Sequence, residues 1–160
     1  MTTFTKWFLL NAIILTGVFF AEQKGAISTI IKNDLSYISV LIMTLYVLFS
    51  AYVGRLSYLA DKIRVGKVTA LDELDVLTRR SDVGWFAAEH FFSLGLLGTI
   101  IGLIISTGGS LDASMPTSDI VAGLKKGLNT AFYTTVCGIV FSLPLQVQLM
   151  ILKFKLEKDA

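Results

Sequence analysis

The sequence predicts an all-α membrane protein with four transmembrane helices, and its composition and charge pattern support that prediction. Of its 160 residues, 54% are hydrophobic and only 16% are charged, whereas a soluble domain usually carries about 25% charged residues. Uncharged stretches of 20, 21 and 26 residues occupy positions 35–54, 91–111 and 127–152. Because a helix needs about 20 mostly apolar residues to cross a bilayer, each stretch is long enough for one span.

A shorter apolar stretch near the N-terminus predicts the first span, over about residues 7–21. A cleaved signal peptide is the competing interpretation, since Lys6 precedes this apolar segment. However, Phe19 and Phe20 lie where a cleavage site would need small residues. We therefore favour a membrane helix, which can tilt, thin the bilayer or continue past its charges toward Ile31.

The other three spans follow the long uncharged stretches, over about residues 35–54, 85–107 and 118–153. Pro116 precedes the last of them, and the hydroxyl of Ser118 can cap free backbone N–H groups where the helix starts.

Lys and Arg are unevenly distributed between the two sides of the predicted membrane. The short segment 55–83 and the two termini together hold ten, and the opposite side holds four. Cytoplasmic segments of membrane proteins carry the excess of Lys and Arg, so we expect both termini and residues 55–83 in the cytoplasm. A helix with Leu71, Leu74 and Leu77 on one face is expected within this segment, packed on its own protein or docking a partner. Residues 1–160 are expected to form a single membrane domain.

The sequence offers no basis for an enzyme, a nucleic-acid-binding protein or a bound cofactor. The net charge is +2, and basic residues do not cluster with aromatic ones. One histidine cannot form a zinc site of the H-E-x-x-H type, and neither a G-x-S-x-G motif nor a phosphate-binding loop is present. We expect no catalytic residue, no metal, no cofactor and no nucleic-acid partner.

The third and fourth predicted spans carry small residues at helical spacing. In lipid, helices associate through close packing of small residues, and steps of three or four place such residues on one helix face. These faces indicate either ordinary packing inside one subunit or the assembly of several copies. They consist of Gly95, Gly98, Gly102 and Ser106 in the third span, and of Gly127, Ala131, Thr135, Gly138 and Ser142 in the fourth.

Threonine hydroxyls gather on the same two spans: Thr99 in the third, and Thr130, Thr134 and Thr135 in the fourth. A single threonine can bond its own helix, but a cluster is better explained by a wet or close-packed interior. No Asp, Glu, Lys or Arg lies in the middle of any span, although such residues mark proton relays in membranes. If the protein conducts ions, we expect a partner to supply the ionisable group.

Two motifs on these spans resemble the channel-forming helices of the MotA/TolQ/ExbB family. The first is GLLGTIIGL at residues 95–103, and the second is GLNTAFYTTVCGI at residues 127–139, with Pro144 six residues after Gly138. The resemblance covers about residues 91–152.

The resemblance implies a homopentamer in the bacterial cytoplasmic membrane, whose third and fourth spans line a central pore. A dimeric single-span partner, similar to MotB, TolR or ExbD, would sit in the pore and carry an Asp that faces Thr99 and Thr135. The residues expected to line the pore are Thr99, Thr130, Ala131, Thr134, Thr135 and Ser142, and those expected to pack the helices are Gly95, Gly98, Gly102, Gly127 and Gly138.

The resemblance further implies an ion channel subunit that couples an ion gradient to mechanical work. The proton is the expected ion, and Na⁺ is the alternative. A non-conducting oligomeric membrane scaffold that assembles or anchors another protein is the rival hypothesis, because packed small-residue faces would serve a scaffold equally well.

Overall fold

The computed structural model describes residues 2–63, 70–108 and 116–159, which form five helices. Four of these helices are long and apolar enough to cross a membrane, which confirms the predicted all-α architecture with four spans. A short helix, α2, is an addition that the hydropathy pattern did not single out. The helices are α1 (Thr3–Gln23), α2 (Ala26–Asn33), α3 (Ile38–Lys62), α4 (Ala70–Gly108) and α5 (Thr117–Asp159).

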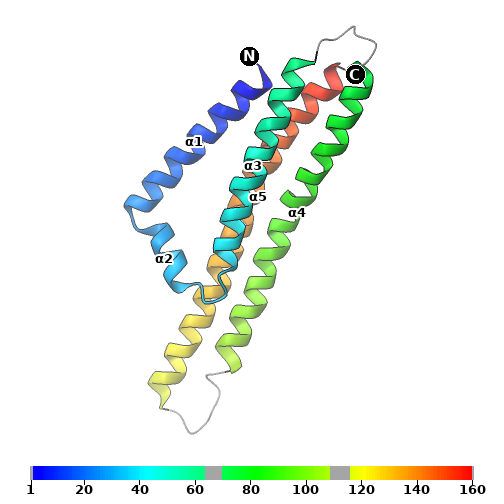
Figure 1. Ribbon diagram of the computed structural model, residues 1–160. Coiled ribbons are helices and arrows are strands. Elements are labelled where there is room, and N and C mark those ends of the chain that lie inside the picture. The colour runs from blue at the N-terminus through cyan, green and yellow to red at the C-terminus, as the bar shows by residue number, and fades with distance from the viewer. Residues whose placement is uncertain (1, 64–69, 109–115, 160) are drawn as a thin grey trace.

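A turn separates α1 from α2, so the first span does not run on as one helix toward Ile31 (Figure 1). Gly25 adopts a φ of 71°, in the left-handed region that glycine occupies at no steric cost. The Glu22 carboxylate accepts hydrogen bonds from the backbone N–H and the hydroxyl of Ser28, at 3.1 and 2.5 Å. Glu22 therefore satisfies a free N–H group in the first turn of α2.

The connection between α2 and α3 shortens the second span at its start. Asp34 is buried, and its carboxylate accepts a hydrogen bond of 2.8 Å from the backbone N–H of Ser39, in the first turn of α3. Tyr37 takes a left-handed conformation with a φ of 58° immediately before the helix. This capped turn explains why α3 begins at Ile38 rather than near Leu35.

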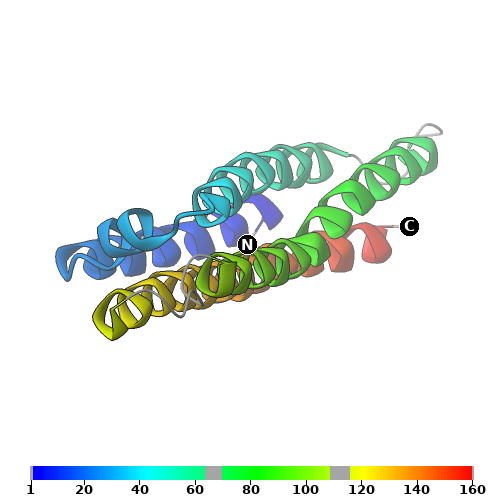
Figure 2. The ribbon, with the colours of Figure 1, turned by 90° about the horizontal axis from the view of Figure 1, so that it is seen from below.

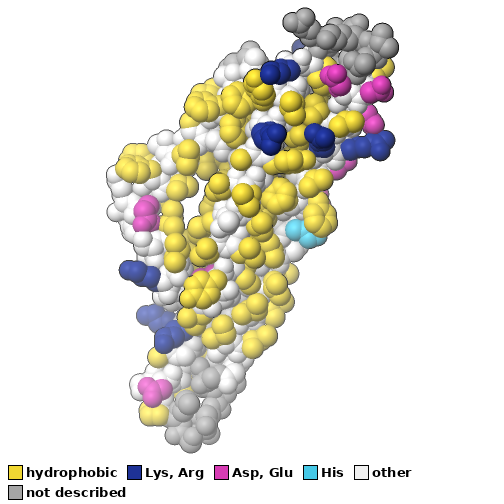
Figure 3. Space-filling view, viewed as in Figure 1, with side chains coloured by type: hydrophobic (Ala, Val, Ile, Leu, Met, Phe, Trp, Pro, Cys, Tyr) yellow, Lys and Arg dark blue, Asp and Glu magenta, His cyan; other side chains and the backbone are white. Residues whose placement is uncertain are grey.

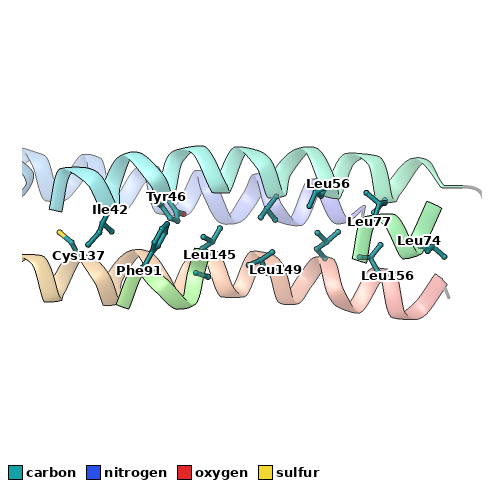
Figure 4. Packing of buried hydrophobic residues seen from close by; sticks show 14 of the residues in the cluster. Ile42, Tyr46, Leu56, Leu74, Leu77, Phe91, Cys137, Leu145, Leu149 and Leu156 are labelled. Atoms are coloured by element: carbon teal, nitrogen blue, oxygen red, sulfur yellow. The ribbon is translucent and has the colours of Figure 1, made fainter. Parts of the chain in front are cut away.

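One continuous helix of 39 residues, α4, joins the helix expected within segment 55–83 to the third span. Leu74 and Leu77 are buried in the same hydrophobic cluster as Leu156 of α5, whereas Leu71 is exposed (Figure 4). Most of the leucine face is thus buried within the protein's own helix bundle.

The bundle is built on the antiparallel pair formed by α4 and α5, which share the most extensive interface. The helix α3 packs on both members of this pair, and α1 contacts α3 and α5 (Figures 1 and 2). Both ends of the chain lie at the same end of the bundle (Figure 1). This end carries the excess of Lys and Arg, which makes it the expected cytoplasmic end.

The core lies between α3 and the α4–α5 pair, and the outer surface is apolar. Ile42, Leu145 and Leu149 are fully buried at its centre (Figure 4). Large apolar side chains cover much of the surface (Figure 3), and Ile13 and Leu15 of α1 are 69% and 67% exposed. Soluble monomeric proteins rarely expose apolar patches of this extent, so the surface is that of a protein embedded in lipid.

Candidate functional site

The two small-residue faces pack against each other within one chain, along the α4–α5 interface. A Cβ atom added at Gly102 would lie 2.6 Å from the carbonyl oxygen of Gly127 and 2.6 Å from the backbone nitrogen of Ala131. A Cβ atom added at Gly138 would lie 2.8 Å from the carbonyl oxygen of Phe91. Both neighbours are backbone atoms, so any side chain at these positions would have to move one helix away from the other.

Gly95 and Gly98 complete this interface on α4. A Cβ atom at Gly95 would lie 2.9 Å from the carbonyl oxygen of Thr134, and one at Gly98 would overlap the Thr134 side chain. All five glycines expected to pack helices therefore lie between α4 and α5. The glycines on each helix contact the other helix of the same subunit. These small-residue faces therefore do not by themselves require a second copy of the chain.

Thr99 and Thr135 lie at the edge of this interface, and their hydroxyl groups are hydrogen-bonded to each other across the two helices. The Thr135 hydroxyl also donates to the carbonyl oxygen of Ala131 at 3.0 Å, and the Thr99 hydroxyl lies 3.2 Å from the carbonyl oxygen of Gly95. Both side chains are only partly buried. Both residues are therefore partly exposed at the surface of the subunit, in the middle of an apolar stretch.

The other residues expected to line a pore are buried inside the subunit: Thr130, Ala131, Thr134 and Ser142 are each 3% exposed or less. The Thr134 hydroxyl donates to the carbonyl oxygen of Thr130 at 2.9 Å. The Ser142 hydroxyl donates to the carbonyl oxygen of Ala88 at 2.7 Å and so connects α5 to α4. Successive residues are about 100° apart around a helix, which places Thr134 and Thr135 on different sides of α5.

Thr130 has a separate structural partner at the end of α2. Its hydroxyl accepts a hydrogen bond from the backbone N–H of Leu35 at 3.1 Å and lies 3.2 Å from the carbonyl oxygen of Asn33. These two groups belong to the connection between α2 and α3. Thr130 thus ties that connection to α5.

A second polar cluster joins α1, α3 and α5, and no sequence motif indicated it. Gln148 is 1% exposed; its amide nitrogen donates to the Tyr46 hydroxyl at 3.2 Å, and its amide oxygen accepts from the Trp7 indole N–H at 3.2 Å. The Ser50 hydroxyl lies 3.0 Å from the Gln148 amide oxygen and 2.9 Å from the Asn11 side-chain oxygen. Unpaired polar groups are costly in apolar surroundings, so these bonds hold α1 against the bundle.

Acidic and basic side chains are distant from the Thr99–Thr135 pair along both of its helices. The nearest in sequence are His90 on α4 and Lys126 on α5, each nine residues away, which corresponds to about 14 Å along a helix. The His90 ring is hydrogen-bonded to its own helix, since Nδ1 lies 2.7 Å from the carbonyl oxygen of Phe86. Within the described ranges, no cluster of His, Cys, Asp or Glu could hold a metal ion. The two helices thus provide hydroxyls at this site but no carboxylate.

Comparison with known proteins matches the half of the chain that holds this site. The model of a family described as the MotA/TolQ/ExbB proton channel family matches residues 67–159. The match includes α4, α5, the glycine interface and the Thr99–Thr135 pair, whereas α1, α2 and α3 lie outside it. No curated protein and no solved structure matches the chain.

Proposed function

Because the chain belongs to the MotA/TolQ/ExbB proton channel family, we propose that it is the ion-conducting subunit of a membrane motor in the bacterial cytoplasmic membrane. Several copies, most simply five, surround a dimeric single-span partner that carries an intramembrane Asp. Ion flow past that Asp, with the proton as the expected ion, drives movement of the partner relative to the ring.

The Thr99–Thr135 hydroxyl pair is the observation that supports this proposal most directly. The two side chains are only partly buried, and they lie at the edge of the α4–α5 interface. Two hydroxyls hold about four lone pairs, and their mutual hydrogen bond occupies one of them. The remaining lone pairs can accept a hydrogen bond from a protonated carboxyl group or stabilise a passing cation where lipid is excluded.

The glycine interface gives this hydroxyl pair its fixed geometry. Gly95 and Gly138 contact each other on one side of the pair, and Gly102 packs against Gly127 and Ala131 on the other, so backbone contacts flank the pair. Rigid packing on both sides keeps the two hydroxyls within hydrogen-bonding distance. Preorganised dipoles of this kind stabilise charge without first having to reorient.

The partner must contribute the ionisable group, since α4 and α5 offer no carboxylate near the two threonines. An Asp carboxylate next to the pair would alternate between protonated and ionised forms. The hydroxyls can accept from the protonated form and, after rotation, donate to the ionised form. The four buried residues Thr130, Ala131, Thr134 and Ser142 then have a structural role within each subunit.

Ion flux through the complex tests this function. The chain is co-expressed with a single-span partner of the MotB, TolR or ExbD type, and the complex is reconstituted into vesicles. Acidification of the lumen is followed after a gradient is imposed. We expect flux from the complex and none when the partner's intramembrane Asp is replaced by Asn. A stable assembly that carries no H⁺ and no Na⁺ would instead support the non-conducting scaffold.

A further inference from the structure

A hollow of about 510 Å³ lies between the N-terminal end of α1 and the C-terminal end of α5. Its lining includes three basic side chains, Lys6 from α1 and Lys155 and Lys158 from α5, together with Asp61 of α3. The lining also includes apolar side chains of α5, among them Phe154, which is 62% exposed. One hollow therefore presents ammonium groups next to an apolar surface.

The carboxylates near this hollow are already engaged by other groups. Asp61 accepts hydrogen bonds from the backbone N–H groups of Thr3 and Phe4, at 2.9 and 2.8 Å, and thereby caps the start of α1. Capping carboxylates are stabilised by the positive end of the helix dipole. The Asp159 carboxylate, near the end of α5, forms an ion pair with Lys155.

Two ammonium groups at the hollow form no ion pair with the described part of the chain. Among the residues that the structure describes, Lys6 and Lys158 form no ion pair. An isolated cation at a membrane boundary attracts anionic lipid, and each Lys or Arg near the surface adds to that attraction.

The position of the hollow matches the boundary between hydrocarbon and headgroups. Lys6 directly precedes the apolar stretch of α1, and Lys155 and Lys158 follow the uncharged stretch of α5. We propose that this hollow binds an anionic phospholipid of the leaflet that faces both termini. Its phosphate lies between Lys6 and Lys158, and an acyl chain extends over Phe154. This site is separate from the Thr99–Thr135 pair and does not depend on the ion-conducting function.

Binding of radiolabelled phosphatidylglycerol to the purified full-length protein in detergent tests the proposal, with phosphatidylcholine as the zwitterionic comparison. The test variant is Lys6→Gln/Lys158→Gln. The matched control is Lys125→Gln/Lys126→Gln, which removes the same charge at the opposite end of the bundle. We expect the test variant to lose affinity for phosphatidylglycerol by at least about fivefold, the effect of a single basic residue at a lipid surface. The control variant is expected to bind as the unmodified protein does.

Four outcomes would overturn the proposal. The first is equal loss of affinity in the test and control variants, which would indicate a general charge effect. The second is unchanged affinity in the test variant, and the third is equal binding of the two lipids. The fourth is displacement of the lipid by inorganic phosphate at matched ionic strength, which would identify a free phosphate as the ligand. Circular dichroism of both variants verifies that the helices remain folded.

Discussion

The hydroxyl groups of Thr99 and Thr135 form a hydrogen bond that joins α4 to α5 at the edge of a glycine-lined interface. The two residues are 36 positions apart in the sequence and come from antiparallel helices. Their contact depends on backbones that approach closely just above and just below them. The glycines and the threonines are therefore parts of one structural unit, and substitutions in each part should have different effects.

Replacing Gly138 with Ala should destabilise the subunit itself. The new Cβ atom would lie 2.8 Å from the carbonyl oxygen of Phe91, a backbone atom that cannot rotate away. Overpacking of this kind commonly costs about 1–3 kcal/mol. Gly17→Ala is the matched control, because nothing lies within 4 Å of a Cβ atom there. Thermal unfolding in detergent, followed by circular dichroism, should show a lower midpoint for Gly138→Ala alone. Equal midpoints for the two variants would contradict the packing argument.

Replacing Gln148 with Leu should loosen α1 without unfolding the remaining helices. The substitution removes the donor to the Tyr46 hydroxyl and one of two acceptors of the Trp7 indole N–H, the other being the carbonyl oxygen of Ser50. Hydrogen bonds between membrane helices contribute about 0.6–2 kcal/mol each. Gln146→Leu is the control, since Gln146 bonds Ser142 on its own helix. The readout is Trp7 fluorescence in a Trp85→Phe background, and we expect a shifted emission only for Gln148→Leu. An unshifted spectrum would show that the cluster does not hold α1.

The number of spans could be predicted from the sequence, because length and hydropathy alone decide whether a helix can cross a bilayer. The true lengths of α4 and α5 could not, since Leu74 and Leu77 continue the packing beyond the apolar stretch. The hydrogen bond from Ser39 to Asp34 and the turn at Gly25 explain why the start of α3 and the end of α1 differ from the predicted positions.

The residues of the candidate site could be predicted from the sequence, but the contacts that each of them makes could not. Glycines at helical spacing allow close packing equally well within a chain and between chains. Their spacing in the sequence therefore did not assign Gly98 or Gly138 to the α4–α5 interface. Thr134 and Thr135 are neighbours in the sequence, yet only Thr135 reaches the surface. The contact between Asn11 and Gln148 joins residues 137 positions apart, and no local pattern encodes such a pairing.

Purified protein should be a homo-oligomer, with a pentamer as the simplest expectation from the family. The glycine faces of α4 and α5 pack against each other within one chain. Contacts between copies must therefore involve other surfaces, such as the exposed apolar side chains of α4 and α5. Mass measurement after extraction in mild detergent or into nanodiscs gives the number of copies. A monomer in both preparations would contradict the proposed pore.

The final prediction is that Thr135→Val and Thr99→Val leave folding and assembly intact but reduce ion flux. Valine is β-branched like threonine and nearly matches its shape, so the packing around the glycines should survive. The substitution removes the hydroxyl that the partner's carboxyl group would bond. Loss of a hydrogen bond to a charged group costs about 1.5–3 kcal/mol. This cost would slow the step in which the partner's carboxyl group is ionised roughly 10-fold or more.

Thr44→Val is the matched control for both variants, because the Thr44 hydroxyl bonds the carbonyl oxygen of Val40 on its own helix at 2.9 Å. If the hydroxyls of Thr99 and Thr135 served only their own helices and each other, all three variants would conduct like the unmodified chain. The partner's Asp→Asn variant sets the zero of the flux measurement. Reduced flux in Thr135→Val and Thr99→Val, with normal flux in Thr44→Val and equal oligomer yield in all three, would place the ion pathway at this edge of the α4–α5 interface.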